Sequence, residues 1–321
     1  MQTLTTWHPD LTQPPFYFPM SALLKRRFGE PVYKVTIDAG FTCPNIDGSK
    51  ATGGCTYCDN TSFSPALRKG DPEIRRQIEN GAKFYRERYQ AQKFLAYFQT
   101  YTNTYDDVSR LRRLYDDALA HQDIVGMSVG TRPDCIDAAK LALFQQYAER
   151  MQDKLICIEY GMQTMHDATA ERINRAHGHA DTVAAVELTR KIAPDVHLCL
   201  HLIAGLPGEN ASMIRASIDE CARLAPDSIK FHHCYVYENT VLARQWRDGQ
   251  YEAPALQSHV QLAADCIERM PPATAIQRLV GEISSPGVLA PTWGKTKMQV
   301  VGLITDELRR RGTHQGSRFA S

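Results

Sequence analysis

The chain has 321 residues and a formal net charge of +1 at pH 7. This near-neutral balance gives no global positive field, so composition alone does not mark a nucleic-acid-binding protein. Hydrophobic residues make up 43% and charged residues 23%, proportions that exclude an intrinsically disordered chain.

The N-terminal residues 1–19 lack a basic segment followed by an apolar core, and so do not predict a secretory signal. No apolar run approaches the roughly 20 residues that a membrane-spanning helix needs. We therefore expect a cytoplasmic protein with no membrane partner. The oligomeric state is not predicted.

In chain order, short β-branched runs alternate with longer amphipathic segments. Strands are predicted at residues 32–38, 94–99, 124–129, 155–160, 196–203 and 228–237, with a seventh at 275–283. Helices are predicted between them, at residues 72–92, 108–121, 138–151, 166–175, 181–192 and 211–224. This alternation predicts an α/β fold with a parallel sheet: a partial or full (β/α) barrel of about six βα units. Functional groups are then expected at the carboxyl ends of the strands.

The predicted barrel occupies residues 31–270, after an N-terminal segment of residues 1–30. From residue 271 the chain becomes proline-rich and then basic, with a helix near 297–311. About fifty residues are near the lower limit for independent folding. We therefore interpret residues 271–321 as a C-terminal extension packed on the barrel.

Three of the nine cysteines are clustered directly after the first predicted strand. Cys43, Cys55 and Cys58 are spaced Cys-x11-Cys-x2-Cys in a loop rich in Gly, Asn and Asp. Glycines allow such a loop to aim several thiolates at one centre. Iron–sulfur clusters are held by Cys thiolates, typically four, so three ligands would leave one iron open. Structural zinc would instead need a fourth ligand from elsewhere in the chain. Both kinds of metal site stay open at this point.

The loop resembles that of the radical S-adenosylmethionine (SAM) superfamily, in a variant with a long first gap. The whole chain resembles the YhcC-like (YhcC/YtqA) radical SAM proteins of bacteria, and more distantly the radical SAM domain of the Elongator catalytic subunit. The motifs that carry the resemblance run along nearly the whole chain: Cys43–Gly48, Gly53–Cys58, Tyr97–Thr104, Val129–Cys135, Glu159–Thr164, Ile173–Arg175, His201–Glu209 and Leu289–Trp293.

The resemblance implies that Cys43, Cys55 and Cys58 ligate a [4Fe–4S] cluster whose fourth iron is chelated by SAM. Reduction would then cleave SAM to a 5′-deoxyadenosyl radical that abstracts hydrogen from the substrate. Tyr57 matches an aromatic position near the adenine, although it could equally pack on the barrel rim. Gln163 and Arg175 match residues that hold the ribose and the carboxylate of SAM, and a guanidinium suits a carboxylate.

Three further residues are predicted to bind the cofactor. Gly130 stands where several relatives carry a ribose-binding Glu, and Glu159 from the neighbouring strand is its predicted substitute. His201 matches a ribose-binding position in some relatives, but a strand histidine can also be a satisfied core residue. Gln99 ends the second predicted strand, where it would contact SAM or substrate or belong to a hydrogen-bonded rim.

The likeness to the Elongator subunit implies a tRNA partner, modified on the side chain of its wobble uridine. The alternatives are a radical SAM enzyme for a small metabolite or a protein side chain, and a non-enzymatic metal-binding interaction protein. Basic clusters at residues 25–27 and 309–311, with Arg318, are either solvated faces or contacts for a polyanion. The chemistry also implies an electron donor such as flavodoxin or ferredoxin.

Overall fold

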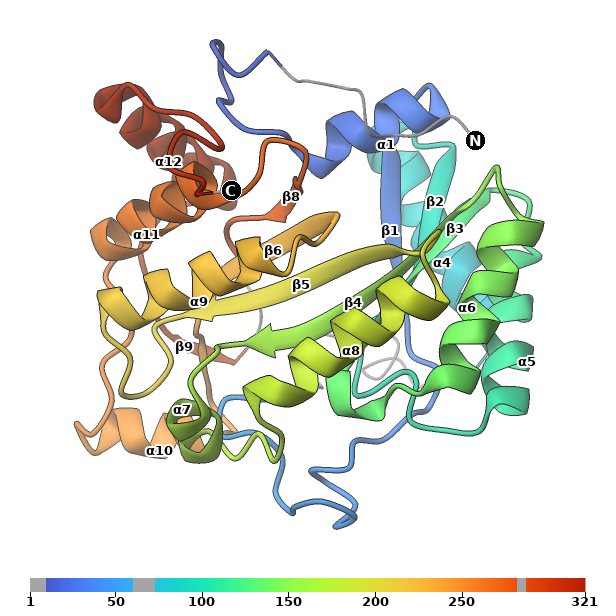
Figure 1. Cartoon of the computed structure of the whole chain (residues 1–321), viewed down its shortest axis with the longest axis horizontal. Helices are drawn as coiled ribbons and strands as arrows, with labels where there is room; N and C mark the ends of the chain where they lie inside the picture. Colours follow the sequence, from blue (N-terminus) through green and yellow to red (C-terminus); the bar gives the residue numbers. More distant parts are fainter. Residues whose placement is uncertain (1–9, 60–72, 282–286, 321) are drawn as a thin grey trace.

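The computed structural model describes residues 10–59, 73–281 and 287–320. Seven parallel strands form one curled sheet in which the spatial order follows the chain order (Figure 1). The strands are β1 (Val32–Ile37), β2 (Lys93–Phe98), β3 (Ile124–Thr131), β4 (Leu155–Gln163), β5 (His197–Ala204), β6 (Ser228–His233) and β8 (Ala275–Arg278). Among the described residues the two edge strands, β1 and β8, do not pair with each other. The predicted fold is confirmed, in its partial-barrel form.

Helices connect the strands along the outside of the sheet (Figure 1). They are α4 (Ile74–Tyr89), α5 (Val108–Leu119), α6 (Ala138–Arg150), α7 (Asp167–Arg172), α8 (His179–Ile192) and α9 (Ala211–Arg223), with a short 3₁₀ turn at Pro133–Cys135. Asp107, Asp137 and Asn210 cap α5, α6 and α9, because their side chains accept backbone N–H groups of the first turn.

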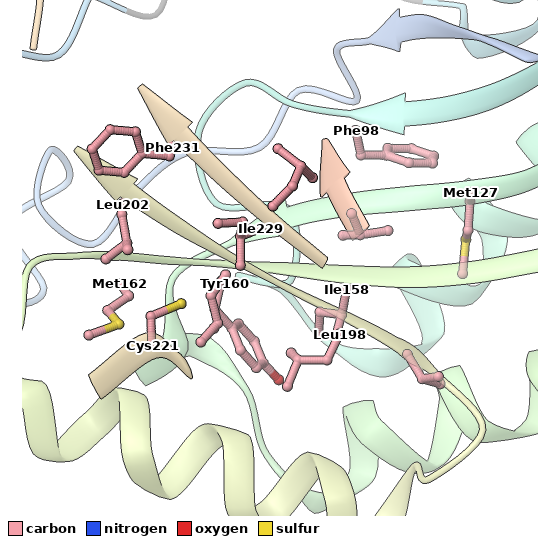
Figure 2. Packing of buried hydrophobic residues seen from close by; sticks show 14 of the residues in the cluster. Phe98, Met127, Ile158, Tyr160, Met162, Leu198, Leu202, Cys221, Ile229 and Phe231 are labelled. Carbon is pink, nitrogen blue, oxygen red and sulfur yellow. The ribbon is translucent and has the colours of Figure 1, made fainter. Parts of the chain in front are cut away.

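The strands present apolar side chains to the helices and polar side chains to the interior of the curl. Figure 2 shows Ile158, Tyr160 and Met162 among the buried apolar residues. The Tyr160 hydroxyl lies 2.7 Å from Thr189 Oγ1 of α8, so this face of β4 points to the helix layer. Because side chains alternate along a strand, Glu159, Gly161 and Gln163 face the interior. This alternation places the chemistry inside the barrel.

Two predicted strands differ from the structure. Residues 228–237 divide into β6 and β7 (Val236–Tyr237), and β7 pairs antiparallel with β9 (Val288–Ala290). The neighbouring strand β5 ends at Ala204, whose carbonyl accepts from the Cys234 amide, so no partner continues the ladder beyond that point. The strand predicted at 275–283 ends at Arg278, and residues 282 and 283 lie outside the described part of the chain, as does the predicted helix start at Pro72.

Three helices were not predicted: α1 (Met20–Phe28), α10 (Val241–Arg247) and α11 (Leu256–Arg269). Leu23 and Leu24 of α1 pack with Leu155 and Ala275, which begin β4 and β8, and so close the amino-terminal end of the barrel. In Figure 1, α1 lies at the end opposite the loop that follows β1.

The predicted basic helix is α12 (Lys297–Arg311), and its buried Val300, Ile304 and Leu308 join the main core. Strand β8 also comes from the predicted extension, so this part of the chain completes the sheet as well as packing on it. No described helix combines the length and the apolar character needed to cross a membrane.

Candidate active site

A cavity of about 510 Å³ lies inside the curl of the sheet. All nine residues predicted to hold the cofactors line it: Cys43, Cys55, Tyr57, Cys58, Gln99, Glu159, Gln163, Arg175 and His201. They come from the loop after β1, from strands β2, β4 and β5 or their ends, and from the turn after α7. The structure therefore brings these residues to one place, although 158 positions separate the first from the last.

The cysteine loop places Cys55 in the protein interior and Cys43 and Cys58 half-buried. Burial and the neighbouring Cys55 and Cys43 thiols raise the pKa of Cys58. Among the described residues, ligand atoms of three His, Cys, Asp or Glu side chains lie mutually within 4.8 Å only at Glu159, Cys199 and His201. The sulfurs of Cys43, Cys55 and Cys58 are therefore not all within 4.8 Å of one another, whereas tetrahedral zinc–thiolate bonds place sulfurs about 3.8 Å apart. This wider spread suits a polynuclear cluster.

Two donors lie against the buried sulfur of Cys55. Asn45 Nδ2 and Arg175 Nη1 are each 3.6 Å from Cys55 Sγ. Burial alone would lower the pKa of Arg175, but Tyr57 and Cys55 raise it, so the guanidinium stays charged. A fixed positive charge beside a cluster ligand stabilises negative charge on that ligand.

The end of β4 is shaped around Arg175, which is 8% exposed. Arg175 Nη2 donates a 2.7 Å hydrogen bond to the Gly161 carbonyl oxygen. A Cβ atom on Gly161 would lie 2.8 Å from Arg175 Nη2 and 2.5 Å from Gln163 Nε2, so a larger residue there would displace the ends of these two side chains. Gln163 has φ +65°, a left-handed conformation that non-glycine residues seldom adopt outside functional sites.

Orphaned polar atoms show that the cavity is prepared for a polar ligand. Gln163 Oε1, Arg175 Nε and Arg132 Nη1 are buried and have no hydrogen-bond partner among the described residues. Leaving such groups unpaired costs about 1–3 kcal/mol each, which a ligand would recover. One acceptor and two cationic donors fit a ligand that carries hydroxyl and carboxylate groups, as SAM does. The residues present thus fit both implied cofactors.

Tyr57 and Gln99 both line the cavity but come from different parts of the fold. Tyr57 packs against the apolar cluster that includes Ile203, Leu206 and Tyr251, and burial raises the pKa of its phenol. Gln99 follows β2, and its backbone N–H donates to the Ile37 carbonyl oxygen. Their contacts with SAM stay predictions.

Glu159 is fully buried in β4. Its Oε1 accepts from Lys34 Nζ at 2.8 Å and from the Ser128 hydroxyl, and its Oε2 accepts from His201 Nε2 at 2.9 Å and from Lys230 Nζ. Gly130 is the cross-strand neighbour of Glu159 in the β3–β4 ladder, as the predicted substitution requires. The contact of Glu159 or His201 with the SAM ribose stays a prediction, and both side chains already have protein partners.

Sequence reasoning gave no role to four cationic residues that line the cavity: Lys34, Arg132, Lys230 and Arg278. Arg132 makes a two-point ion pair with Asp134, with both N···O distances 2.9 Å. Burial alone would raise the pKa of Asp134, but hydrogen bonds from Arg132 and Lys50 lower it to about 2. Lysine at the centre of the apolar runs of β1 and β6 was the signal that could have identified Lys34 and Lys230.

Comparisons with known proteins agree with this geometry. The model of the Radical SAM superfamily matches residues 47–221, and that of the Radical_SAM C-terminal domain matches residues 226–310. YtqA of Bacillus subtilis is 34% identical over 303 residues, covering 94% of this chain and 92% of that protein. Protein YhcC of Escherichia coli is 35% identical over 294 residues, covering 92% of each.

This chain also resembles two further proteins, of which it covers a smaller share. A tRNA uridine(34) acetyltransferase of Dehalococcoides mccartyi is 29% identical over 168 residues, which are 51% of this chain and 35% of that protein. The structure of an Elp3 from Methanocaldococcus infernus, with residues 1–46 deleted, has a TM-score of 0.64 at 17% identity, covering 88% of this chain and 64% of that one. At that identity the likeness shows the fold alone.

The superfamily match spans more than half of the chain, and both full-length relatives exceed 30% identity. The site shows the three cysteines and the prepared cavity that such chemistry needs. The chain therefore belongs to the Radical SAM superfamily, and it is an enzyme that uses a [4Fe–4S] cluster and SAM.

Proposed function

We propose that this enzyme modifies the side chain of the wobble uridine, position 34, of tRNA. The observation that carries the proposal is the 29% identity to the tRNA uridine(34) acetyltransferase of Dehalococcoides mccartyi. This chain covers only 35% of that protein. We therefore propose the same substrate and the same position in it, but not the same acetyl transfer.

The residues of this chain would divide the work of the site. Cys43, Cys55 and Cys58 would hold the cluster, while Arg175 and Gln163 would orient SAM through the atoms that are otherwise unpaired. When bound, the cluster and SAM supply a 5′-deoxyadenosyl radical for hydrogen abstraction. The cavity walls would exclude water from that step, and a protein of the flavodoxin or ferredoxin class would deliver the electron.

A small acidic metabolite is a second candidate substrate, and the charges on the protein surface favour it. Three arginines of the C-terminal basic region pair internally: Arg309 with Asp306, Arg310 with Glu307, and Arg318 with Glu268. Arg27 donates to the Lys154 carbonyl oxygen. These four arginines therefore already have internal partners, which makes them less available to phosphates.

The test uses protein reconstituted without oxygen, SAM, dithionite and bulk cellular tRNA, which carries natural uridine side chains. We expect tRNA to raise 5′-deoxyadenosine formation and to change the mass of one nucleoside derived from position 34. Chromatography measures the first and mass spectrometry of digested tRNA the second. Cys55→Ala should lose both, and RNA binding should weaken steeply with salt.

Stimulation by small carboxylic acids with no response to tRNA would overturn the tRNA assignment in favour of the second candidate. A colourless protein that binds zinc, or a cluster whose EPR spectrum is indifferent to SAM, would contradict the role of the cysteine loop itself.

A further inference from the structure

A layer of polar side chains crosses the interior of the barrel and forms the inner part of the cavity. Every strand of the sheet contributes to it: Lys34, Tyr97, Ser128, Glu159, His201, Lys230, and Gln277 with Arg278. Its cations have no role predicted from the sequence, and none of them belongs to the cofactor-binding residues described above.

Glu159 is the only carboxylate of this layer, and both lysines contact it. Lys34 Nζ also donates to Gln277 Oε1 at 2.8 Å and lies 3.4 Å from Ser128 Oγ, so its three donors are all occupied. Lys230 Nζ donates to the Tyr97 hydroxyl at 2.7 Å and to Glu159. An ammonium group has three donors, so one N–H of Lys230 is left for another acceptor.

Arg278 adds a third cation that nothing in the layer neutralises. A β-bulge between the Ile229 and Lys230 positions makes Arg278, rather than Gln277, the cross-strand neighbour of Lys230. Bulges beside active sites re-aim side chains, and here both Gln277 and Arg278 face the interior. The Arg278 side chain has no hydrogen bond or ion pair within the described part of the chain.

His201 of the layer and His232, which also lines the cavity, do not add charge. Burial, followed by the positive charge of Lys230, lowers the pKa of His201 to about 4. Burial and Arg278 hold the pKa of His232 well below its usual value. Near neutral pH the layer therefore carries three cations and one carboxylate. The nearby Glu159–Cys199–His201 group is not a metal site, because two lysine ammonium groups already bind the carboxylate.

We propose that Arg278 and Lys230 form an anion subsite that binds a carboxylate of the substrate. The inference deepens the proposed function, and it rests on it for the assignment of the cavity as the place where substrate reacts. Arg278 presents a planar pair of N–H groups that match a carboxylate, and Lys230 offers its remaining N–H beside it. Phosphates of an RNA backbone lie outside a cavity of this size, so the acid belongs to the small group that undergoes reaction.

The test is a ligand-observed NMR titration of the reconstituted enzyme with acetate, with acetamide as the neutral probe of the same shape. Saturating SAM is present throughout, so that acetate cannot take the place of the SAM carboxylate. We expect acetate to bind and acetamide not to. Arg278→Gln should weaken acetate binding at least tenfold, and Arg278→Lys, which keeps the charge, should retain most of it.

Arg112→Gln is the matched control, because Arg112 is a half-buried arginine that does not line the cavity and whose side chain donates to Gln146. It should bind acetate as the wild type does. Equal binding by Arg278→Gln, equal affinity for acetamide, or no acetate binding in the presence of SAM would each overturn the proposal. Thermal unfolding of each variant shows that it is folded; since Arg278 has no described partner, Arg278→Gln should melt within a few degrees of the wild type.

The titration contains no RNA, so its result is independent of the tRNA assignment. Acetate binding without any response to tRNA would leave the subsite and favour the small acidic substrate. A response to tRNA without acetate binding would leave the proposed function and remove the subsite.

Discussion

His201 illustrates how a single side chain takes on two roles that its sequence context does not separate. It was predicted to contact the SAM ribose or to be a satisfied core histidine. In the structure it lines the cavity and donates to Glu159, so it is both accessible to a ligand and supported by the protein. The motif shows that a polar residue belongs at this position, but the partner comes from β4, 42 residues away in the chain.

The buried imidazole of His201 predicts a pH dependence of stability. Its pKa is about 4 in the folded protein, against an ordinary value of 6.5, because burial and Lys230 disfavour the charged form. A base with a depressed folded pKa contributes stability above pH 6.5 that is lost as the pH falls towards 4. Linkage gives a loss of about 2 kcal/mol at pH 5.

Urea unfolding of wild type and His201→Gln between pH 8 and pH 5 measures this contribution. The Gln side chain can still donate to Glu159 but does not titrate, so the variant should lose about 2 kcal/mol less than the wild type over this range. His314→Gln removes an exposed histidine and should follow the wild-type profile. Parallel profiles for wild type and His201→Gln would contradict the assignment of a neutral buried His201.

At the scale of the elements, strands and helices that alternate regularly could be predicted, and those that depend on tertiary partners could not. Six of the helices between strands were predicted because they show helical spacing and lie between two predicted strands. By contrast, α1 has no preceding strand, and its apolar residues find their partners at the starts of β4 and β8. Likewise, residues 228–237 have one apolar pattern, but β5 ends before the pattern does.

Helix α12 shows why a basic run was ambiguous. Arg311 Nη1 lies 2.6 Å from Asp265 and 3.1 Å from Glu268, and its Nε lies 2.8 Å from Glu307. Arg311→Met would leave these buried acids with fewer cations, so we expect it to destabilise the protein by about 3 kcal/mol in denaturant unfolding.

Arg309→Met on the same helix is the comparison. Its pair with Asp306 is exposed on both sides, and such pairs contribute about 0–1 kcal/mol. If both variants cost the same, the network around Arg311 would not hold α12 against α11.

For the molecule as a whole, periodicity predicted the barrel type but not whether the barrel closes. Closure depends on the two edge strands, and no pattern within either strand reports on the other. Within the described residues β1 and β8 do not pair with each other, yet the Lys34 side chain crosses the opening to Gln277. The cations of the inner polar layer were not predicted for the same reason, since the members of the layer share a site only after the sheet curls.

Because Lys34 links β1 to β8, we expect this one side chain to stabilise the curled sheet as a unit. Lys34→Met would remove a donor to Glu159 and the link between β1 and β8, and we expect a loss of about 3 kcal/mol in unfolding free energy. Faster amide hydrogen exchange in β1 should accompany it. Lys83→Met, which breaks an exposed pair with Glu87, should change stability by less than about 1 kcal/mol and leave exchange in β1 unaltered.

The volume of the cavity limits which part of an RNA substrate can enter it. About 510 Å³ accommodates small molecules and no stretch of folded RNA. A tRNA bound as proposed must therefore turn the target base out of its stack and insert it alone. Extrusion costs least where a base is already unpaired, as in a single-stranded loop, and a few kcal/mol more within a duplex. A uridine placed in a helical stem would thus react poorly even with every neighbouring nucleotide unchanged, because selection would act on the ease of unstacking before it acts on sequence.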